Sequence, residues 1–309
     1  MKLKALITGV SGFVGPYLVK HLVTNGFEVF GIDRAGTKVE GCVVSVCDIT
    51  DAAAVAAVVQ RVRPDFIFHL AGQSSVALSW KEPELTRKVN VGGTRNLLKA
   101  VADAGMNPKV LVISSAEVYG IAKKFPTSES EPLKPISPYG ESRVEQESLA
   151  LEYFRTKGVR LVISRSFNHT GPGQPSGLVC SNFAKQFAVI EKGKQQPVVR
   201  VGDLSVVRDF SDVRDVVRAY QVLLQKGSFG EVYNVCSGKA YSIGEILERL
   251  VKLSGLKVKV EQETSRIREH AVPVFHGDNS KLAAATGWKP EISFDKTLSD
   301  LLDYWRKSV

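Results

Sequence analysis

The feature that most constrains what this chain can fold into is a glycine-rich turn near its start. Residues 3–7 form an apolar run that predicts a β-strand, and glycine then recurs at every third position, as Gly9, Gly12 and Gly15. In such a turn Gly9 permits the tight bend, Gly12 lets the backbone approach a pyrophosphate, and Gly15 allows a helix to pack closely on the strand. The N-terminus of that helix offers unpaired N–H groups to phosphates, so the turn predicts a dinucleotide site. The other residues expected to line it are Ser11, Phe13 and Val14.

The first half of the chain alternates short β-branched runs with helical patterns. This alternation is typical of a parallel sheet with helices on both faces, and it predicts the α/β class with a Rossmann-type doubly wound sheet. Strands are expected at residues 2–8, 28–32, 42–46, 66–70, 110–114 and 159–164. Helices are expected at residues 12–25, 51–61, 84–104, 138–157 and 294–306.

The composition of the sequence changes after residue 168, because residues 170–177 are rich in glycine and proline. Later helices are separated by short strands. We therefore expect a dinucleotide-binding domain at residues 1–167, to which some later segments return. Residues 168–309 are expected to form mainly a smaller C-terminal α/β lobe that binds the substrate.

The composition excludes several classes of protein. The net charge is +9, but the basic residues are scattered, which argues against nucleic acid and favours a small, doubly phosphorylated substrate. No apolar run approaches the roughly 20 residues of a membrane-spanning helix, and the start lacks a signal-peptide layout, so we expect a soluble, cytoplasmic protein away from membranes. The four cysteines have no metal-ligand spacing and are expected to be reduced, and no metal site is predicted.

Asp33 is expected to end the second strand, 18 residues after Gly15. A carboxylate at that place can accept hydrogen bonds from both hydroxyls of the adenosine ribose and repels a 2′-phosphate, which favours NAD(H). Arg34 stands beside it and can bind a 2′-phosphate, so NADP(H) stays an alternative. Asp48 and Ile49 end the third strand, where contact with the adenine edge is expected.

A serine, a tyrosine and an arginine suggest proton transfer. Tyr139 and Arg143 lie four residues apart on a predicted helix and so share a face. A fixed cation one turn away favours the phenolate form of a tyrosine. Ser115, at the end of the fifth strand, can hold the oxygen that reacts.

With these features the chain resembles the extended short-chain dehydrogenases/reductases, the group of nucleotide-sugar epimerases, dehydratases and reductases. The resemblance implies that Tyr139 is the acid/base, that Ser115 holds the reacting oxygen, and that Arg143 assists. The sequence departs from the family's Y-x-x-x-K motif, because position 143 is Arg. We expect function to survive with an altered rate or pH optimum. The supporting motifs are residues 9–15, 69–76, 90–94, 115–119 and 165–173. The further cofactor residues implied are Leu70, Ala71, Gly72, Gln73 and Asn90.

The C-terminal motifs most resemble those of family members that act on GDP-sugars. They imply NAD(P)H-dependent reduction of the C4 keto group of GDP-4-dehydro-6-deoxy-D-mannose to GDP-D-rhamnose, although Ala271 replaces a glutamate that relatives carry. Three alternatives stay open: a GDP-mannose 4,6-dehydratase, a UDP-sugar 4-epimerase and a catalytically silent dinucleotide-binding protein. The resemblance also implies a homodimer formed through the helices at 84–104 and 138–157, both of which are expected to be amphipathic. Glu117 occupies the position of the base that removes the C5 proton in dehydratases. The substrate residues implied are Ser75, Glu117, Asn168, Arg208 and Arg268, whereas Arg214, flanked by two aspartates, is expected to be structural.

Overall fold

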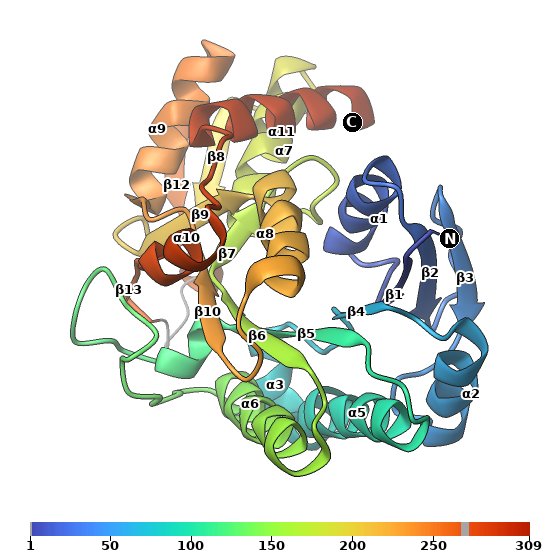
Figure 1. The fold of residues 1–309 in the computed structure, drawn as a ribbon. Coiled ribbons are helices and arrows are strands. Elements are labelled where there is room, and N and C mark those ends of the chain that lie inside the picture. Colours follow the sequence, from blue (N-terminus) through green and yellow to red (C-terminus); the bar gives the residue numbers. More distant parts are fainter. Residues whose placement is uncertain (1, 267–271) are drawn as a thin grey trace.

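A seven-stranded parallel sheet organises the fold in the computed structural model, which describes residues 2–266 and 272–309 (Figure 1). Its strands are β1 (Lys4–Thr8), β2 (Glu28–Asp33), β3 (Cys42–Val46), β4 (Phe66–His69), β5 (Lys109–Ser115), β6 (Leu161–Ser166) and β10 (Val232–Val235). They follow the order β10-β6-β5-β4-β1-β2-β3. The order reverses direction between β1 and β4, where Thr8 pairs with His69. In open α/β sheets this switch point, at the carboxyl ends of the strands, is where ligands bind.

Helices cover both faces of this sheet. On one face lie α1 (Val14–Thr24) and α8 (Val213–Lys226); on the other lie α2 (Ala52–Val62), α5 (Gly93–Asp103) and α6 (Pro138–Lys157). Every residue of β4 and β6 is buried, as expected for strands covered on both faces. The predicted doubly wound sheet is therefore confirmed.

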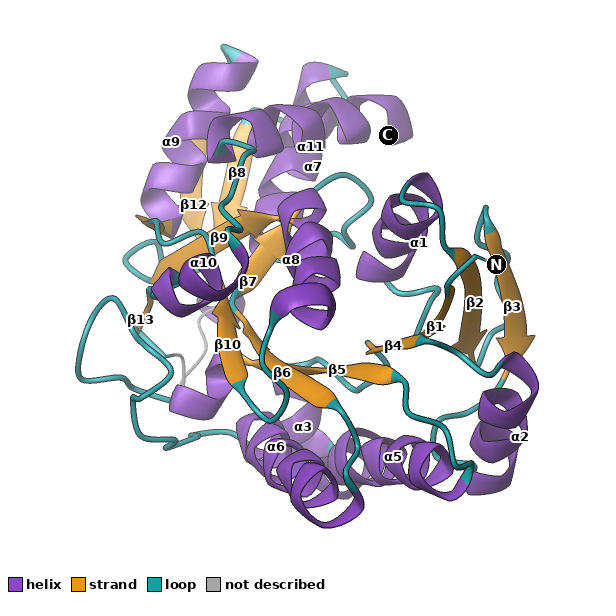
Figure 2. Ribbon diagram, in the orientation of Figure 1, coloured by secondary structure: helices purple, strands orange, loops and turns teal. Residues whose placement is uncertain are grey.

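The C-terminal lobe, whose helices and short strands are seen in Figure 2, has its own hydrophobic core. Three helices, α7 (Val179–Glu191), α9 (Ile243–Ser254) and α11 (Phe294–Ser308), enclose that core together with two small sheets. The first sheet contains β7 (Asn168–Thr170), β9 (Val207–Asp212), β11 (Ala240–Ser242) and β13 (Val274–Phe275), and the second pairs β8 (Val198–Val201) with β12 (Lys259–Gln262). Helix α10 (Ser280–Thr286) packs beside α8 and β10, so the two lobes are interleaved along the chain.

Helix α6 begins and ends where the sequence predicts. The Ser137 side chain accepts from the Gly140 N–H at 3.1 Å, Pro138 occupies the first turn, and Gly158 ends the helix with φ +66°. The buried face of α6 is not uniformly apolar: it includes the polar residues Ser142, Arg143, Gln146 and Glu147 beside the apolar Leu149 and Ala150. The amphipathic pattern expected for α6 is thus wrong.

The helix expected at residues 84–104 is divided. It consists of α4 (Pro83–Arg87), a π-helical turn (Lys88–Gly92) and α5, and a separate helix α3 (Val76–Lys81) precedes it. The π-turn inserts one extra residue per turn, a feature often found at functional sites. Within the described ranges, no helix combines the length and the apolar character needed to cross a membrane.

Candidate active site

The glycine turn follows β1 at the switch point of the sheet. Gly9 has φ +69°, and a Cβ there would lie 2.9 Å from the backbone nitrogen of Ala71, in the loop after β4. A Cβ on Gly15 would lie 1.9 Å from the carbonyl oxygen of Val10, so only glycine lets α1 approach the turn. At Gly12 an added Cβ would meet only the Gly9 oxygen, at 3.3 Å, and the backbone there stays approachable.

Two aromatic residues connect this turn to the C-terminal lobe. The Phe13 ring stacks on that of His169, with centroids 6.2 Å apart and planes at 5°. The Tyr17 hydroxyl donates to the carbonyl of Pro172 at 2.6 Å. Burial raises the pKa of Tyr17 to about 12, so this hydroxyl keeps its proton at neutral pH.

Asp33, which is expected at the adenosine end of the site, is held by the backbone. One carboxylate oxygen accepts from the Ser11 N–H and the other from the Ala35 N–H, each at 3.2 Å. Arg34 is exposed beside it.

Asp48 and Ile49 lie at the end of the neighbouring strand. The backbone N–H of Thr50 lowers the pKa of Asp48, which favours its carboxylate form. Ile49 is 6% exposed within the core, and its carbonyl accepts from the Asn96 side chain at 3.0 Å.

The residues present fit a nicotinamide dinucleotide. Four buried side-chain polar atoms lack a hydrogen-bond partner among the described residues, and two of them, Ser11 Oγ in the turn and Arg143 Nε on α6, belong to the predicted cofactor site. Buried polar groups are normally paired, so these two atoms are candidates to contact a bound cofactor. A phosphate oxygen beside Ser11 and a ribose hydroxyl beside Arg143 would supply the missing partners.

Asn90 joins the loop after β4 to helix α6. Its Oδ1 accepts from the Gln73 N–H at 2.8 Å, and its Nδ2 donates to the Gln73 carbonyl at 3.1 Å and to Ser142 Oγ at 2.9 Å. The π-turn places Asn90 so that it is fully buried between these elements. The side-chain amide of Gln73 donates to Thr86 Oγ1. Ser75 caps α3 by accepting from the Leu78 N–H.

Tyr139 and Arg143 share the face of α6 that meets the sheet, as predicted. Both are nearly buried, at 7% and 5% exposed, and the guanidinium lies 5.1 Å from the centre of the tyrosine ring. Arg143 Nη1 donates to the Ile113 carbonyl at 3.0 Å and to Gln146 Oε1 at 2.8 Å. The cation is therefore fixed beside the phenol by groups from two elements.

Ser115 and Glu117 lie next to the start of α6. Ser115 Oγ accepts from the Glu117 N–H at 3.2 Å, which opens a short 3₁₀ turn at Ala116–Tyr119. A Cβ on Gly140 would lie 2.8 Å from the Glu117 carbonyl oxygen. Glycine at 140 thus lets the first turn of α6 approach this 3₁₀ turn, so the segments that carry Ser115, Glu117 and Tyr139 are neighbours.

A buried polar chain that the sequence interpretation missed runs from β1 to Arg143. Thr94 Oγ1 donates to the Asn90 carbonyl, so it accepts from both Gln146 Nε2 and His69 Nε2, each at 2.8 Å. The Nδ1 atom of His69 then accepts from the Thr8 hydroxyl at 2.8 Å. Burial, followed by the charge of Arg143, lowers the pKa of His69 to about 3, so His69 is neutral. The spacing of Gln146, three residues after Arg143, was the one available signal.

The residues expected to bind the substrate diphosphate lie on the small mixed sheet. Asn168 is exposed on β7, and Arg208 lies on the adjacent β9, where its guanidinium stacks 4.9 Å from the centre of the Phe275 ring. Arg214 pairs with Asp212 at 2.7 Å and with Asp300 at 2.8 Å, in agreement with a structural role. Arg268 and Ala271 lie outside the described residues.

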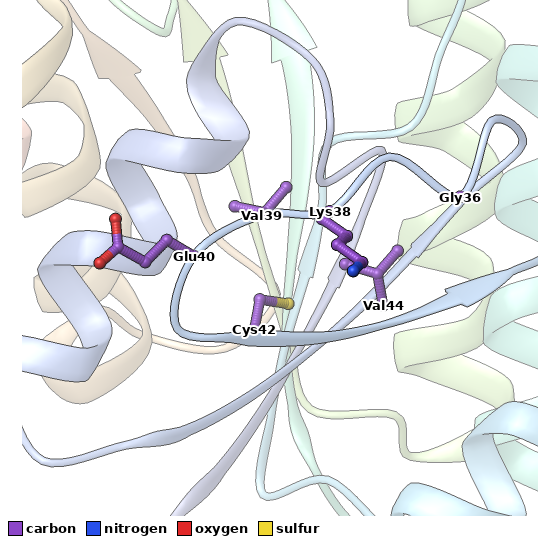
Figure 3. A pocket seen from close by; sticks show the side chains of 6 residues that line it. All are labelled: Gly36, Lys38, Val39, Glu40, Cys42 and Val44. Atoms are coloured by element: carbon purple, nitrogen blue, oxygen red, sulfur yellow. The ribbon is translucent and has the colours of Figure 1, made fainter.

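A shallow pocket lies at the outer edge of the sheet (Figure 3). Its lining comes from the loop after β2 and from β3, and it includes Lys38, Glu40 and Cys42. Burial raises the pKa of Cys42 to about 11, so its thiol is protonated and unreactive at neutral pH. None of the predicted site residues lines this pocket.

The doubly wound sheet, the glycine turn and the serine–tyrosine–arginine cluster together define a class: the extended short-chain dehydrogenases/reductases that modify nucleotide sugars with NAD(P). The chain belongs to the family described as GDP-mannose 4,6 dehydratase, which it matches over residues 6–301.

Known relatives match the chain along its whole length. It is 35% identical to the GDP-6-deoxy-D-mannose reductase of Pseudomonas aeruginosa, with 100% of this chain and 99% of the relative covered. A solved Pseudomonas aeruginosa structure complexed with NADPH is similar, with a TM-score of 0.88, 34% identity and full coverage of both chains. The UDP-glucose 4-epimerase of Thermus thermophilus in complex with NAD has a TM-score of 0.89 at 27% identity and covers 99% of this chain and 100% of its own.

Proposed function

We propose that this protein reduces the C4 keto group of GDP-4-dehydro-6-deoxy-D-mannose and forms GDP-D-rhamnose. The observation that carries the proposal is its 35% identity, over the whole of both chains, to a GDP-6-deoxy-D-mannose reductase. The cluster of Ser115, Tyr139 and Arg143 supplies groups suited to such a reduction.

Bound NAD(P)H supplies the hydride that is transferred to C4. Tyr139 donates its proton to the oxygen at C4, where negative charge develops, and Ser115 donates a hydrogen bond to the same oxygen. The Arg143 guanidinium, fixed beside the phenol, stabilises the tyrosinate that is left until solvent returns the proton.

The substrate diphosphate is assigned to the C-terminal lobe. Arg208 supplies a positive charge that can attract phosphate oxygens, and Asn168 can donate an amide hydrogen bond from the adjacent strand. Arg268 is also proposed to contact the substrate, because the C-terminal motif that contains it resembles that of family members acting on GDP-sugars.

For the cofactor we propose a preference for NADH, set by Asp33. Its carboxylate is held by two backbone N–H groups at the place where a 2′-phosphate would lie, and the repulsion disfavours NADPH. Arg34 offsets part of this repulsion, and one similar structure holds NADPH whereas another holds NAD.

A 4,6-dehydratase is the second candidate, because the family description names that activity and Glu117 lies in the cluster. A 4-keto reductase does not need a carboxylate base there. If GDP-mannose is dehydrated by the protein and the Glu117→Gln variant loses that activity, the dehydratase assignment replaces the reductase.

The decisive experiment supplies GDP-4-keto-6-deoxymannose with NADH or NADPH, follows cofactor oxidation, and identifies the sugar product by NMR. The expected result is stoichiometric cofactor oxidation and GDP-D-rhamnose. Turnover of a UDP-sugar, with NAD retained through purification, would instead establish a 4-epimerase. Cofactor binding without turnover of any 4-keto sugar would establish a silent binding protein.

We also propose a homodimer that uses α6 and the adjoining helices. Arg87 on α4 pairs with Glu145 on α6 at 2.7 Å, so the two helices present a connected outer face. Sedimentation velocity tests this directly, since a monomer at micromolar concentration would contradict it.

A further inference from the structure

The Arg143 side chain is held at one end only. Its Nη1 carries two hydrogens, and both are used by the carbonyl of Ile113 on β5 and Oε1 of Gln146 on α6. Nε is buried without a partner among the described residues. The fold thus anchors one corner of the guanidinium and leaves the Nε edge for a ligand.

The space around the other end of the guanidinium, at Nη2, depends on Gly72, which has no side chain. A Cβ on Gly72 would lie 2.9 Å from Arg143 Nη2 and 3.0 Å from Asn90 Oδ1. The backbone of Gly72 is outside the left-handed region, so any residue could adopt its conformation. Space for the guanidinium, rather than backbone freedom, explains glycine at this position.

Gln146 is itself fixed. Its Nε2 donates to Thr94 Oγ1 at 2.8 Å, and Thr94 is in turn bonded to His69 and to the Asn90 carbonyl. Gln146 and Thr94 are fully buried and His69 is 1% exposed. Gln146 Oε1 therefore cannot turn away from Arg143 without breaking a buried hydrogen bond.

We propose that Gln146 and Gly72 are positioning residues that hold the Arg143 guanidinium against Tyr139. The inference deepens the function proposed above and rests on it for the acid/base role of Tyr139. The attraction between a cation and a phenolate weakens as their separation grows. Displacing the guanidinium from its place, 5.1 Å from the ring centre, therefore makes the phenol harder to ionise.

The test is the titration of the Tyr139 phenol, obtained as the phenolate absorbance of a protein minus that of its Tyr139→Phe counterpart. In Gln146→Met the midpoint should rise by about one pH unit relative to the parent. Gln221→Met is the matched control, because Gln221 is a buried glutamine on α8, across the sheet, and should leave the midpoint unchanged. An unchanged midpoint in Gln146→Met would overturn the role of Gln146.

Two further backgrounds separate positioning from a general disturbance of the fold. In Arg143→Met, the Gln146→Met change should produce no additional shift, and a persisting shift would refute the proposal. Gly72→Ala should raise the midpoint in the parent but not in Arg143→Lys, whose ammonium has no Nη2. If Gly72→Ala has equal effects in both, the space at position 72 serves something other than Arg143.

This titration needs neither cofactor turnover nor a sugar substrate. If the protein proves to be an epimerase or a dehydratase, the expected shifts are unchanged, and only the proposed reaction fails. If the reaction is confirmed and the midpoints do not move, only the positioning proposal fails.

Discussion

At the residue scale, the neutral His69 makes the fold sensitive to acid. An unfolded histidine binds a proton near pH 6.5, whereas burial and Arg143 lower the pKa of the folded one to about 3. Between these values the unfolded state holds more protons, so the free energy of unfolding falls as the pH drops. The contribution is complete above about pH 6.5 and declines by at most about 1.4 kcal/mol per pH unit below it.

Urea unfolding of the parent and of His69→Gln, between about pH 7.5 and pH 5, measures this effect. His21 and His169 also have lowered pKa values and contribute to the slope of the parent. In the variant, the free energy of unfolding should therefore still fall with pH, but with a slope that is shallower by the equivalent of about one proton. Equal slopes in the two proteins would contradict the neutral, buried state of His69.

Asp33 is expected to decide between NADH and NADPH. Asp33→Asn keeps an acceptor for the backbone N–H groups but removes the charge, so the ratio of the NADPH to the NADH dissociation constant should fall on the order of tenfold. Cofactor fluorescence titrations give both constants. Asp103→Asn, an exposed aspartate on α5, is the matched control. An unchanged ratio in Asp33→Asn would mean that other residues determine the cofactor preference.

Residues that work through their own helix could be predicted from the sequence, whereas those that work through distant elements could not. Tyr139 and Arg143 are four positions apart, and helix geometry alone puts them on one face. His69 and Thr94 come from β4 and α5, and only the folded chain shows that one hydroxyl bonds both His69 and Gln146. Their polar side chains carry no periodic signal that distinguishes a buried network from a solvent-exposed face.

At the scale of elements, capping residues made some helix ends predictable but not all, because Ser75 caps α3, a helix that the pattern did not predict. Ser137 marks the start of α6 and Gly158 its end, and Asp51 caps α2 by accepting from the Ala54 N–H at 3.0 Å. The π-turn at Lys88–Gly92 has no cap and no proline, so the pattern predicts one continuous helix there. The turn is stabilised instead by tertiary contacts of Asn90, which no local pattern encodes.

The strand–turn–helix element yields a contrast between two of its glycines. In Gly15→Ala the new methyl would overlap the Val10 carbonyl, so we expect a loss of stability of at least about 1–3 kcal/mol together with a loss of cofactor binding. In Gly12→Ala the methyl meets little protein, so the melting temperature should change little while the methyl blocks the pyrophosphate.

Thermal unfolding and NADH titration of both variants check this contrast. A Gly12→Ala protein that binds cofactor normally would mean that the backbone at position 12 does not approach the phosphates. A Gly15→Ala protein with the stability of the parent would mean that α1 can move away from the turn at little cost.

At the scale of the whole molecule, the sheet is completed by a strand from the second half of the chain. β10 pairs with β6, and α8 packs beside α1 over the same face of the sheet. The alternation of strands and helices predicted the class of the sheet. It could not show which later segment supplies the seventh strand, because Val232–Val235 is short and its partner is distant in sequence. The division at residue 167 stays a prediction.

A fragment of residues 1–167 tests whether that division marks an independent folding unit. Of the 22 buried residues in the core under α1, ten belong to α8, β10 or the segment near Trp288, and the fragment lacks them all. The fragment would therefore expose apolar surface on α1 and the sheet, and we expect it to aggregate or to show no cooperative urea transition. A longer fragment, residues 1–240, restores α8 and β10 and should regain part of that transition. Cooperative unfolding of the 1–167 fragment would instead show that the first six strands and their helices suffice.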